Sequence, residues 1–311
     1  MLWLLQCQAP GHRIQGRGGI RTARSKPIAR TVGRLKAAAF AALRRAASLP
    51  LRMLGDAHRA LALDQLVTSM VSEVALPGGA LRFMTPTPLL QARAGSALSK
   101  ESDTIDWIER FAANEIFWDI GANVGVFGLY AARRRNVFVL AFEPSADNYM
   151  VLCRNIHISN LSDRVVPYCI AFADVTGLGV VNLSTQEMGA ALHQFGRPGD
   201  TSRYWDGGSR TQGMLGYTID QFIQQFQPPF PTHLKIDVDG LEWPILQGAG
   251  ETLRDPRLRS IMAELSISDR NELDSCLAWL AAAGFDLVSR GEVQTSAGQA
   301  AANHFFARTA R

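Results

Sequence analysis

The sequence predicts a doubly wound α/β domain with a mainly parallel sheet. Two observations support this fold class. Short apolar runs alternate with longer helical patterns from about residue 116 onward, and glycine or acidic residues follow several of the apolar runs. With 311 residues and 47% hydrophobic content, the chain can bury a sizeable core.

The first part of the alternation predicts three strands separated by two helices. The first of these helices is apolar on most sides, so we expect it to be buried. The predicted elements are a strand over 116–120, a helix over 124–135, a strand over 137–142, a helix over 146–158 and a strand over 165–172. They are followed by a turn over 174–179, an extra strand over 180–183 and a polar, glycine-rich segment over 196–213.

The second part returns to the same alternation. Pro244 is compatible with a helix because it falls in the first turn, and Gly284 ends the last helix. The predicted elements are a helix over 220–226, a strand over 233–238, a helix over 241–253, a strand over 261–265, a helix over 272–283 and two closing strands over 285–289 and 304–307.

Positive charge is concentrated at the N-terminus. Residues 1–60 carry twelve Lys and Arg residues against Asp56 alone, a formal charge of +11, which leaves −7 for residues 61–311. We therefore predict a basic flexible arm with an amphipathic helix over residues 1–55 and a folded domain over residues 56–311. For the helical stretch 34–54, a solvated surface is favoured over contact with a membrane surface or nucleic acid.

The placement of cysteine and histidine gives no indication of a metal site or a disulfide framework. No CxxC pair occurs and no two His or Cys residues have metal-ligand spacing, so we predict no metal. The cysteines are Cys7, Cys153, Cys169 and Cys276. A reducing compartment is the default for such a chain, and no run approaches the length of a membrane span, so we expect a cytoplasmic protein.

Acidic residues follow the predicted strands at one edge of the sheet. In LKIDVDG, residues 234–240, the side chains of Lys235, Asp237 and Asp239 are expected on one strand face. Because burying an unpaired charge is costly, we expect Lys235 and Asp237 to compensate each other. Ligands of open α/β sheets bind outside the carboxyl ends of the strands. The acidic rim predicted there comprises Asp119, Glu143, Asp174, Asp237, Asp239 and Glu264.

The turn DIGANVG, Asp119 to Gly125, favours a ligand that carries no phosphate. Gly121 and Gly125 allow a sharp turn, but Asn123 occupies the second glycine position of G-x-G-x-x-G, which disfavours a pyrophosphate cradle. Glu143 lies about twenty residues further on, where a carboxylate can bind both hydroxyls of a ribose. A ligand with ribose, adenine and net positive character fits this combination, and S-adenosylmethionine is such a ligand.

From about Glu101 to Ala307 the chain resembles the FkbM-type S-adenosylmethionine-dependent methyltransferases. The matching stretches, in order, are ESDTIDWIERF, FWDIGANVGVFGLYAA, AFEPSADNYMVLCRNIHISN, CIAFADVTG, YTIDQF, LKIDVDGLEWPILQGA, IMAEL and AAAGF. This resemblance implies a Rossmann-like, seven-stranded methyltransferase fold whose last strand is antiparallel. One departure is Asp239, where members of the family commonly have Glu.

The resemblance also implies roles for residues of the rim. Asp119, Gly121, Asn123 and Gly125 would line the methionine part of the cofactor, Glu143 would hold the ribose, and Asp174 with its neighbours would border the adenine. Because an acceptor hydroxyl has to lose a proton, Asp237 is the first candidate for acceptor positioning or general base, with Lys235 tuning it. Asp239 and Glu264 are secondary candidates. Among the histidines, His193 and His233 are interpreted as structural or solvated rather than as acceptor contacts.

The function that these features favour is O-methylation of a hydroxyl on a small molecule or a glycan, with S-adenosylmethionine as donor. A nicotinamide-dependent oxidoreductase is disfavoured because G-x-G-x-x-G is absent. A nucleic-acid methyltransferase that uses the basic arm is disfavoured because the adjoining domain is acidic. A scaffold domain that has lost catalysis is disfavoured because the rim carboxylates and glycines are all present. The sequence predicts no particular oligomeric state.

Overall fold

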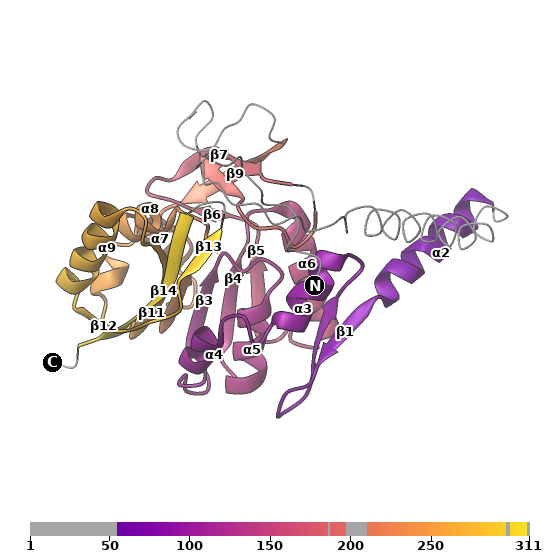
Figure 1. Cartoon of the computed structure of the whole chain (residues 1–311), viewed down its shortest axis with the longest axis horizontal. Helices are drawn as coiled ribbons and strands as arrows, with labels where there is room; N and C mark the ends of the chain where they lie inside the picture. Colours follow the sequence, from indigo (N-terminus) through magenta and orange to yellow (C-terminus); the bar gives the residue numbers. More distant parts are fainter. Residues whose placement is uncertain (1–54, 186, 197–209, 297–298, 310–311) are drawn as a thin grey trace, which may run out of the picture. The chain divides into compact units, whose positions relative to one another are not determined.

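A central sheet with a seven-stranded path organises residues 65–311 in the computed structural model (Figure 1). Its strands are β3 (Ile116–Ile120), β4 (Phe138–Phe142), β5 (Val165–Tyr168), β10 (His233–Ile236), β11 (Ser260–Ser266), β12 (Phe285–Arg290) and β14 (Gln299–Arg308), with β13 (Gln294–Ser296) paired to β14. The order is β12-β14-β11-β10-β3-β4-β5. The strands from β11 to β5 are parallel, whereas β14 runs antiparallel between β11 and β12. This arrangement confirms the predicted fold class and the antiparallel last strand.

Helices cover both faces of this sheet. They are α3 (Pro88–Ser96), α4 (Ser102–Ile108), α5 (Val126–Arg135), α6 (Ala146–Ile158), α7 (Ile219–Phe226), α8 (Glu242–Gln247) and α9 (Arg270–Ala282), with a 3₁₀ turn at Thr252–Arg254. Successive strand residues divide between two cores: Phe117 packs with residues of α4, α5 and α6, while Trp118 packs with residues of α7, α8 and α9. Burial on both faces explains why the parallel strands read as continuous apolar runs.

A second sheet, which the sequence predicts only in part, continues from the end of β5. It contains β6 (Ala171–Phe172), β7 (Gly177–Leu183), β8 (Gln194–Gly196) and β9 (Arg210–Tyr217) in the order β6-β9-β7-β8. The expected strand over 165–172 is therefore wrong, since β5 and β6 belong to different sheets. The expected polar segment over 196–213 contains the start of β9. Gly179 and Gly216 weaken the apolar alternation that indicates a strand, because they carry no side chain. Glycine is required at both positions, since an atom of the Phe195 ring lies 2.4 Å from each ideal Cβ position.

Other differences from the expected elements have local causes. An antiparallel hairpin of β1 (Val71–Val74) and β2 (Leu81–Met84), together with α3 and α4, precedes the first predicted strand. Strand β10 ends at Ile236 instead of residue 238, and Asp239, in the turn that follows, adopts a positive φ of 58°. Helix α8 ends at Gln247 instead of residue 253. A side chain at the next position, Gly248, would approach the carbonyl oxygen of Ala173 to 2.6 Å.

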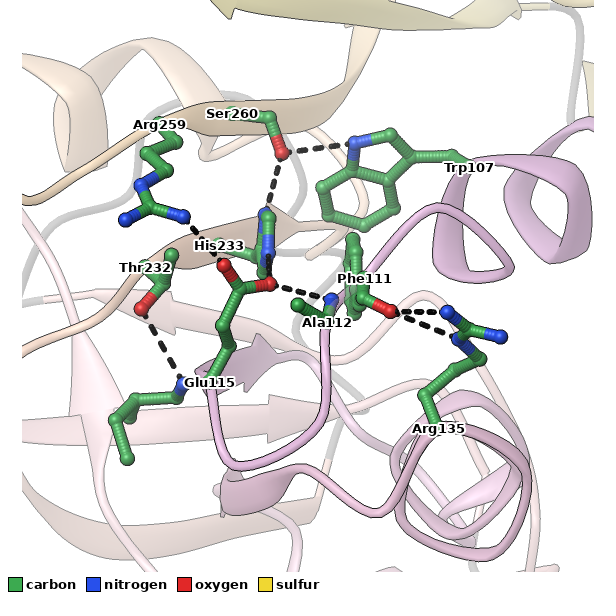
Figure 2. A network of polar contacts seen from close by, with 10 residues as sticks. Trp107, Phe111, Ala112, Glu115, Arg135, Thr232, His233, Arg259 and Ser260 are labelled. Atoms are coloured by element: carbon green, nitrogen blue, oxygen red, sulfur yellow. Dashed lines mark hydrogen bonds and ion pairs between the residues drawn. The ribbon is translucent and has the colours of Figure 1, made fainter.

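A buried polar network fastens the amino ends of β10 and β11 (Figure 2). The imidazole of His233 lies with Nδ1 2.7 Å from Ser260 Oγ and Nε2 2.8 Å from Glu115 Oε2, while Trp107 Nε1 donates to Ser260 Oγ at 3.0 Å. The ring of Phe111 stacks on the imidazole with centroids 3.7 Å apart. Burial lowers the pKa of His233, so the ring is neutral at physiological pH. These contacts explain His233 as a structural residue and lie at the opposite end of the strands from the acidic rim.

The structure describes residues 55–185, 187–196, 210–296 and 299–309. The chain divides into two compact units, residues 1–64 and 65–311, and the described part of the first unit begins helix α2 (Asp56–Ser69). The predicted basic arm and its helix over 34–54 lie outside the described residues. No helix within those ranges is both long enough and apolar enough to cross a lipid bilayer.

Candidate active site

Lys235 occupies the centre of the candidate site. Strands β3 and β10 pair in parallel with Lys235 opposite Asp119, which brings the two side chains to the same face of the sheet. Lys235 Nζ lies 2.9 Å from Asp237 Oδ2 and 3.4 Å from Asp119 Oδ1, and the lysine side chain is only 1% exposed. Burial alone would lower the pKa of Lys235, but the charges of Asp237 and Asp119 raise it above its ordinary value. The ammonium group therefore stays protonated, and the expected Lys235–Asp237 pair is present.

The glycine turn is shaped by the protein's own packing. Gly121 has φ 78°, and a Cβ there would stand 1.8 Å from the carbonyl oxygen of Asp237. Gly125 has φ 91° and begins α5, where a Cβ would stand 2.3 Å from Leu129 Cδ1. Both positions require glycine whether or not a ligand is bound. Asp119 connects the turn to α5, since its Oδ2 accepts a hydrogen bond from the amide of Gly128 at 3.0 Å.

Glu143 follows β4 and is held beside this turn by backbone amides. Its Oε2 accepts from the N–H of Asn123 at 2.8 Å, and its Oε1 accepts from the N–H of Ser145 at 2.8 Å. Asn123 reaches this position with a positive φ of 50°, which asparagine tolerates. Burial raises the pKa of Glu143 to about 7, although both amide hydrogen bonds oppose the shift. The two amide hydrogen bonds thus fix the Glu143 carboxyl group beside the glycine turn.

The segment after β10 carries three more carboxylates. The Asp237 side chain is 24% exposed, and Asp239 Oδ2 accepts from the amide of Leu192 at 2.6 Å. Glu242, which the sequence analysis missed, fastens the turn: its Oε1 accepts from the amides of Val238 at 3.0 Å and Gly240 at 3.2 Å. Burial raises the pKa of Glu242 to about 7, and burial followed by the charge of Asp237 raises that of Asp239.

Two glutamates on neighbouring elements also face this group of charges. Burial and then the charge of Asp237 raise the pKa of Glu264, in β11, to about 9, so this carboxyl is protonated at neutral pH. Burial and Asp237 likewise raise the pKa of Glu101, at the start of α4, whose Oε2 accepts from Asn303 Nδ2 at 3.3 Å. Glu101 was not predicted as a site residue, because nothing in its local sequence indicates that α4 meets the carboxyl end of the sheet.

A small pocket lies between the glycine turn, the end of β4 and the second sheet. It is lined by Ile120, Gly121, Phe142, Pro144, Ile170, Ala171, Phe172, His193, Phe195, Val238 and Leu241. Asp174 is exposed and is absent from this lining; the residues before it, Ile170 to Phe172, are the ones that border the pocket. His193, expected to be structural or solvated, also lines it.

The residues of the site fit S-adenosylmethionine. Apolar and aromatic walls suit an adenine, and the fixed carboxylate of Glu143 beside Pro144 suits the two hydroxyls of a ribose. One buried oxygen of the turn, Asn123 Oδ1, accepts no hydrogen bond within the described part of the chain and could accept one from a ligand. Asp119 Oδ1 is already engaged in the ion pair with Lys235 Nζ at 3.4 Å.

A crossing segment, defined here as residues 189–194, runs over the turn. The carbonyl oxygen of Ala190 accepts from Asn123 Nδ2 at 2.8 Å and from Asn148 Nδ2 at 3.0 Å. The amide of Gly189 donates to Asn148 Oδ1 at 2.7 Å, and the carbonyl oxygen of Gly189 accepts from Arg93 Nε. The crossing segment is thereby attached to the glycine turn, to α6 and to α3.

The sequence of this chain is similar to that of one protein family. A model of the methyltransferase FkbM domain matches residues 119–287, which include every site residue predicted from the sequence. The hexuronic acid methyltransferase AglP of Haloferax volcanii is 26% identical over 200 residues, covering 63% of this chain and 74% of that protein.

Solved structures of methyltransferases are also similar, at low identity. The precorrin-6y C5,15-methyltransferase from Geobacter metallireducens GS-15 is 12% identical, with 68% of this chain and 87% of that chain covered and a TM-score of 0.41. The structure of TYW2 from M. jannaschii in complex with AdoMet is 11% identical, with 77% of this chain and 87% of that chain covered and a TM-score of 0.38.

Proposed function

The chain belongs to the FkbM methyltransferase family, and we propose that it transfers the methyl group of S-adenosylmethionine to a hydroxyl group on a glycan or a small molecule. Membership of this family makes the protein an S-adenosylmethionine-dependent methyltransferase. The observation that carries the finer proposal is the joint position of two features at the carboxyl ends of β4 and β10. These are the Glu143 carboxylate, fixed by the amides of Asn123 and Ser145, and the buried Lys235–Asp237 pair.

The proposed donor site uses the turn and the adjoining pocket. Glu143 would bind the ribose hydroxyls, and Asp119 with Asn123, whose Oδ1 accepts no hydrogen bond in the described part of the chain, would contact the amino-acid part. Gly121 and Gly125 would shape the turn for these contacts. The adenine would lie against Ile170 to Phe172. We propose these pocket residues as the adenine border, with Asp174 as an exposed neighbour.

When bound, S-adenosylmethionine supplies an electrophilic methyl group on a cationic sulfur. The protein has to place the acceptor oxygen in line with that methyl group, exclude water and remove the hydroxyl proton. Lys235 is protonated and cannot accept this proton. Glu264, with a pKa near 9, is also protonated at neutral pH. The oxygens of Glu242 accept backbone amides.

Asp237 is therefore the proposed base or positioning residue. It is an accessible carboxylate whose Oδ2 lies 2.9 Å from Lys235 Nζ. The lysine holds the carboxylate in one orientation, and Asp239 would contribute through the shape of the turn that follows, where its Oδ2 binds the amide of Leu192.

The proposed acceptor is a saccharide that carries a uronic acid. The AglP relative is described as a hexuronic acid methyltransferase, and its similarity covers 63% of this chain. A cytoplasmic location remains a prediction from the sequence.

A labelling experiment tests this function. Purified protein would be given methyl-labelled S-adenosylmethionine with uronic-acid oligosaccharides, neutral oligosaccharides, and RNA or DNA. We expect label in a saccharide as a base-stable methyl ether. A base-labile methyl ester would instead assign transfer to a carboxyl group and contradict the hydroxyl proposal. Label in RNA or DNA alone would favour a nucleic-acid methyltransferase.

A further inference from the structure

Arg93 brings a positive charge to the acidic rim. It lies on α3, and its Nε donates a hydrogen bond to the carbonyl oxygen of Gly189 in the crossing segment. Its aliphatic chain packs there too, because a Cβ added at Gly189 would stand 3.4 Å from Arg93 Cδ. The carbonyl oxygen of the next residue, Ala190, accepts a hydrogen bond from Asn123 Nδ2. The guanidinium is therefore attached, through two adjacent residues, to the turn that frames the proposed donor site.

The charges around Arg93 are predominantly negative. Burial lowers the pKa of Arg93, while the charges of Asp237, Asp239, Glu143 and Glu101 raise it. The crossing segment that Arg93 contacts also binds one of these carboxylates, because the amide of Leu192 donates to Asp239 Oδ2 at 2.6 Å. An arginine remains charged under these conditions.

The hydrogen-bonding capacity of this guanidinium is only partly used. Among the residues that the structure describes, Arg93 makes one side-chain hydrogen bond, from Nε to the carbonyl oxygen of Gly189, and it forms no ion pair with a carboxylate. Lys235 differs, because its ammonium is already paired with two carboxylates. Arg93 therefore has donors left for a ligand.

A ligand carboxylate at the acidic rim would require such a group. S-adenosylmethionine carries a carboxylate besides its cationic sulfur and its ammonium, and a uronic acid also carries a carboxylate. Either carboxylate would be repelled by Asp237, Asp239 and Glu143 unless a cation received it. The planar fork of a guanidinium matches a carboxylate with two parallel hydrogen bonds.

We propose that the guanidinium of Arg93 binds a ligand carboxylate at the acidic rim. The carboxylate is either the amino-acid carboxylate of S-adenosylmethionine or the carboxylate of an acidic sugar acceptor. The inference rests on the proposed function. It makes Arg93 a binding residue that lies outside the part of the chain matched by the family model.

The experiment compares ligands with and without a carboxylate. Calorimetry with S-adenosylhomocysteine and with methylthioadenosine, which lacks the amino-acid part with its carboxylate and ammonium, tests the donor. Ligand-detected NMR with glucuronate and with glucose tests the acceptor. The variants are Arg93→Met, and Arg93→Lys as a milder change that keeps the charge. Arg110→Met is the control, since Arg110 is exposed and lies at the amino ends of the strands.

If the donor carboxylate is bound, Arg93→Met lowers the affinity for S-adenosylhomocysteine about 10- to 100-fold and leaves that for methylthioadenosine unchanged. If the acceptor carboxylate is bound, the loss appears for glucuronate and not for glucose. We expect Arg93→Lys to lose less than Arg93→Met in either arm, and the control to match the wild type.

Two results overturn the inference. One is wild-type affinity of Arg93→Met for S-adenosylhomocysteine with an unchanged response to glucuronate. The other is an equal loss for S-adenosylhomocysteine and methylthioadenosine in both Arg93 variants, which would assign Arg93 to the shape of the pocket. Failure of the proposed function looks different, because the wild-type protein would then bind neither S-adenosylmethionine nor S-adenosylhomocysteine.

Discussion

Replacing Asp237 with Asn tests the centre of the site. The substitution keeps the size of the side chain but removes the charge that lies 2.9 Å from Lys235 Nζ. Leaving a buried charge without its partner typically costs about 3–5 kcal/mol. Here Lys235 keeps Asp119 at 3.4 Å and Asp237 is 24% exposed, so we expect a loss of about 2–3 kcal/mol in the free energy of unfolding.

The effect of Asp237→Asn on catalysis should be larger than its effect on cofactor binding. A positioned general base contributes about 10²- to 10⁴-fold to a rate, so we expect kcat to fall by roughly that factor. The affinity for S-adenosylmethionine, measured by calorimetry, should stay within about threefold, because the groups proposed to bind the donor are untouched. Asp274→Asn, an exposed position on α9, is the matched control. Turnover of Asp237→Asn within about threefold of wild type would refute the proposed role.

Three further predictions follow from individual contacts. Glu143→Gln should weaken S-adenosylmethionine binding, measured by calorimetry, at least about tenfold. The ribose would lose a charged acceptor, and the new NH₂ group would face a backbone N–H that now donates to the carboxylate. Unchanged affinity would contradict the proposed role of Glu143. Gly121→Ala should lower the free energy of unfolding by more than about 3 kcal/mol, since its Cβ would stand 1.8 Å from the carbonyl oxygen of Asp237. The control Gly213→Ala, whose Cβ would have no atom within 4 Å, should change the free energy of unfolding by less than about 0.5 kcal/mol. Equal effects of the two substitutions would contradict the packing at Gly121. Burial raises the pKa of Glu143 to about 7, so the folded state binds this proton more tightly than the unfolded state does. Protonation of Glu143 therefore contributes about 3 kcal/mol to the free energy of unfolding. This contribution is fully present below about pH 4.3, the ordinary glutamate pKa, and is lost as the pH rises through 7. Denaturant unfolding between pH 5 and 8 should therefore show a smaller loss of stability for Glu143→Gln than for wild type, and parallel profiles would contradict the shift.

Hydrophobic pattern and local chemistry predicted much of the central sheet. The bounds of β3 and α6 agree with those expected from the sequence, since each element has a clear apolar period and a polar boundary. The Lys235–Asp237 contact was also predictable, because the two residues are neighbours along one strand and its extension. The glycine turn was correctly placed, although the atoms that exclude a side chain at Gly121 belong to the protein.

The remaining parts depend on tertiary contacts that no local pattern encodes. The pairing of Lys235 with Asp119 follows from the register of β10 on β3, which are more than 100 residues apart in the chain. Strand β9 was missed because Gly213 and Gly216 interrupt its alternation, and the reason for Gly216 is a distant ring, that of Phe195. The charges that α3 and α4 bring to the site likewise become visible only after the fold is known.

The most direct test of the account is calorimetric titration of S-adenosylmethionine into the purified protein, with Glu143→Ala beside it. We predict one binding site per chain in the wild type and at least about a tenfold weaker affinity in the variant, because Glu143 is the carboxylate held beside the glycine turn. No heat of binding, together with no change in the melting temperature when S-adenosylmethionine is added, would contradict the claim that this site holds the methyl donor.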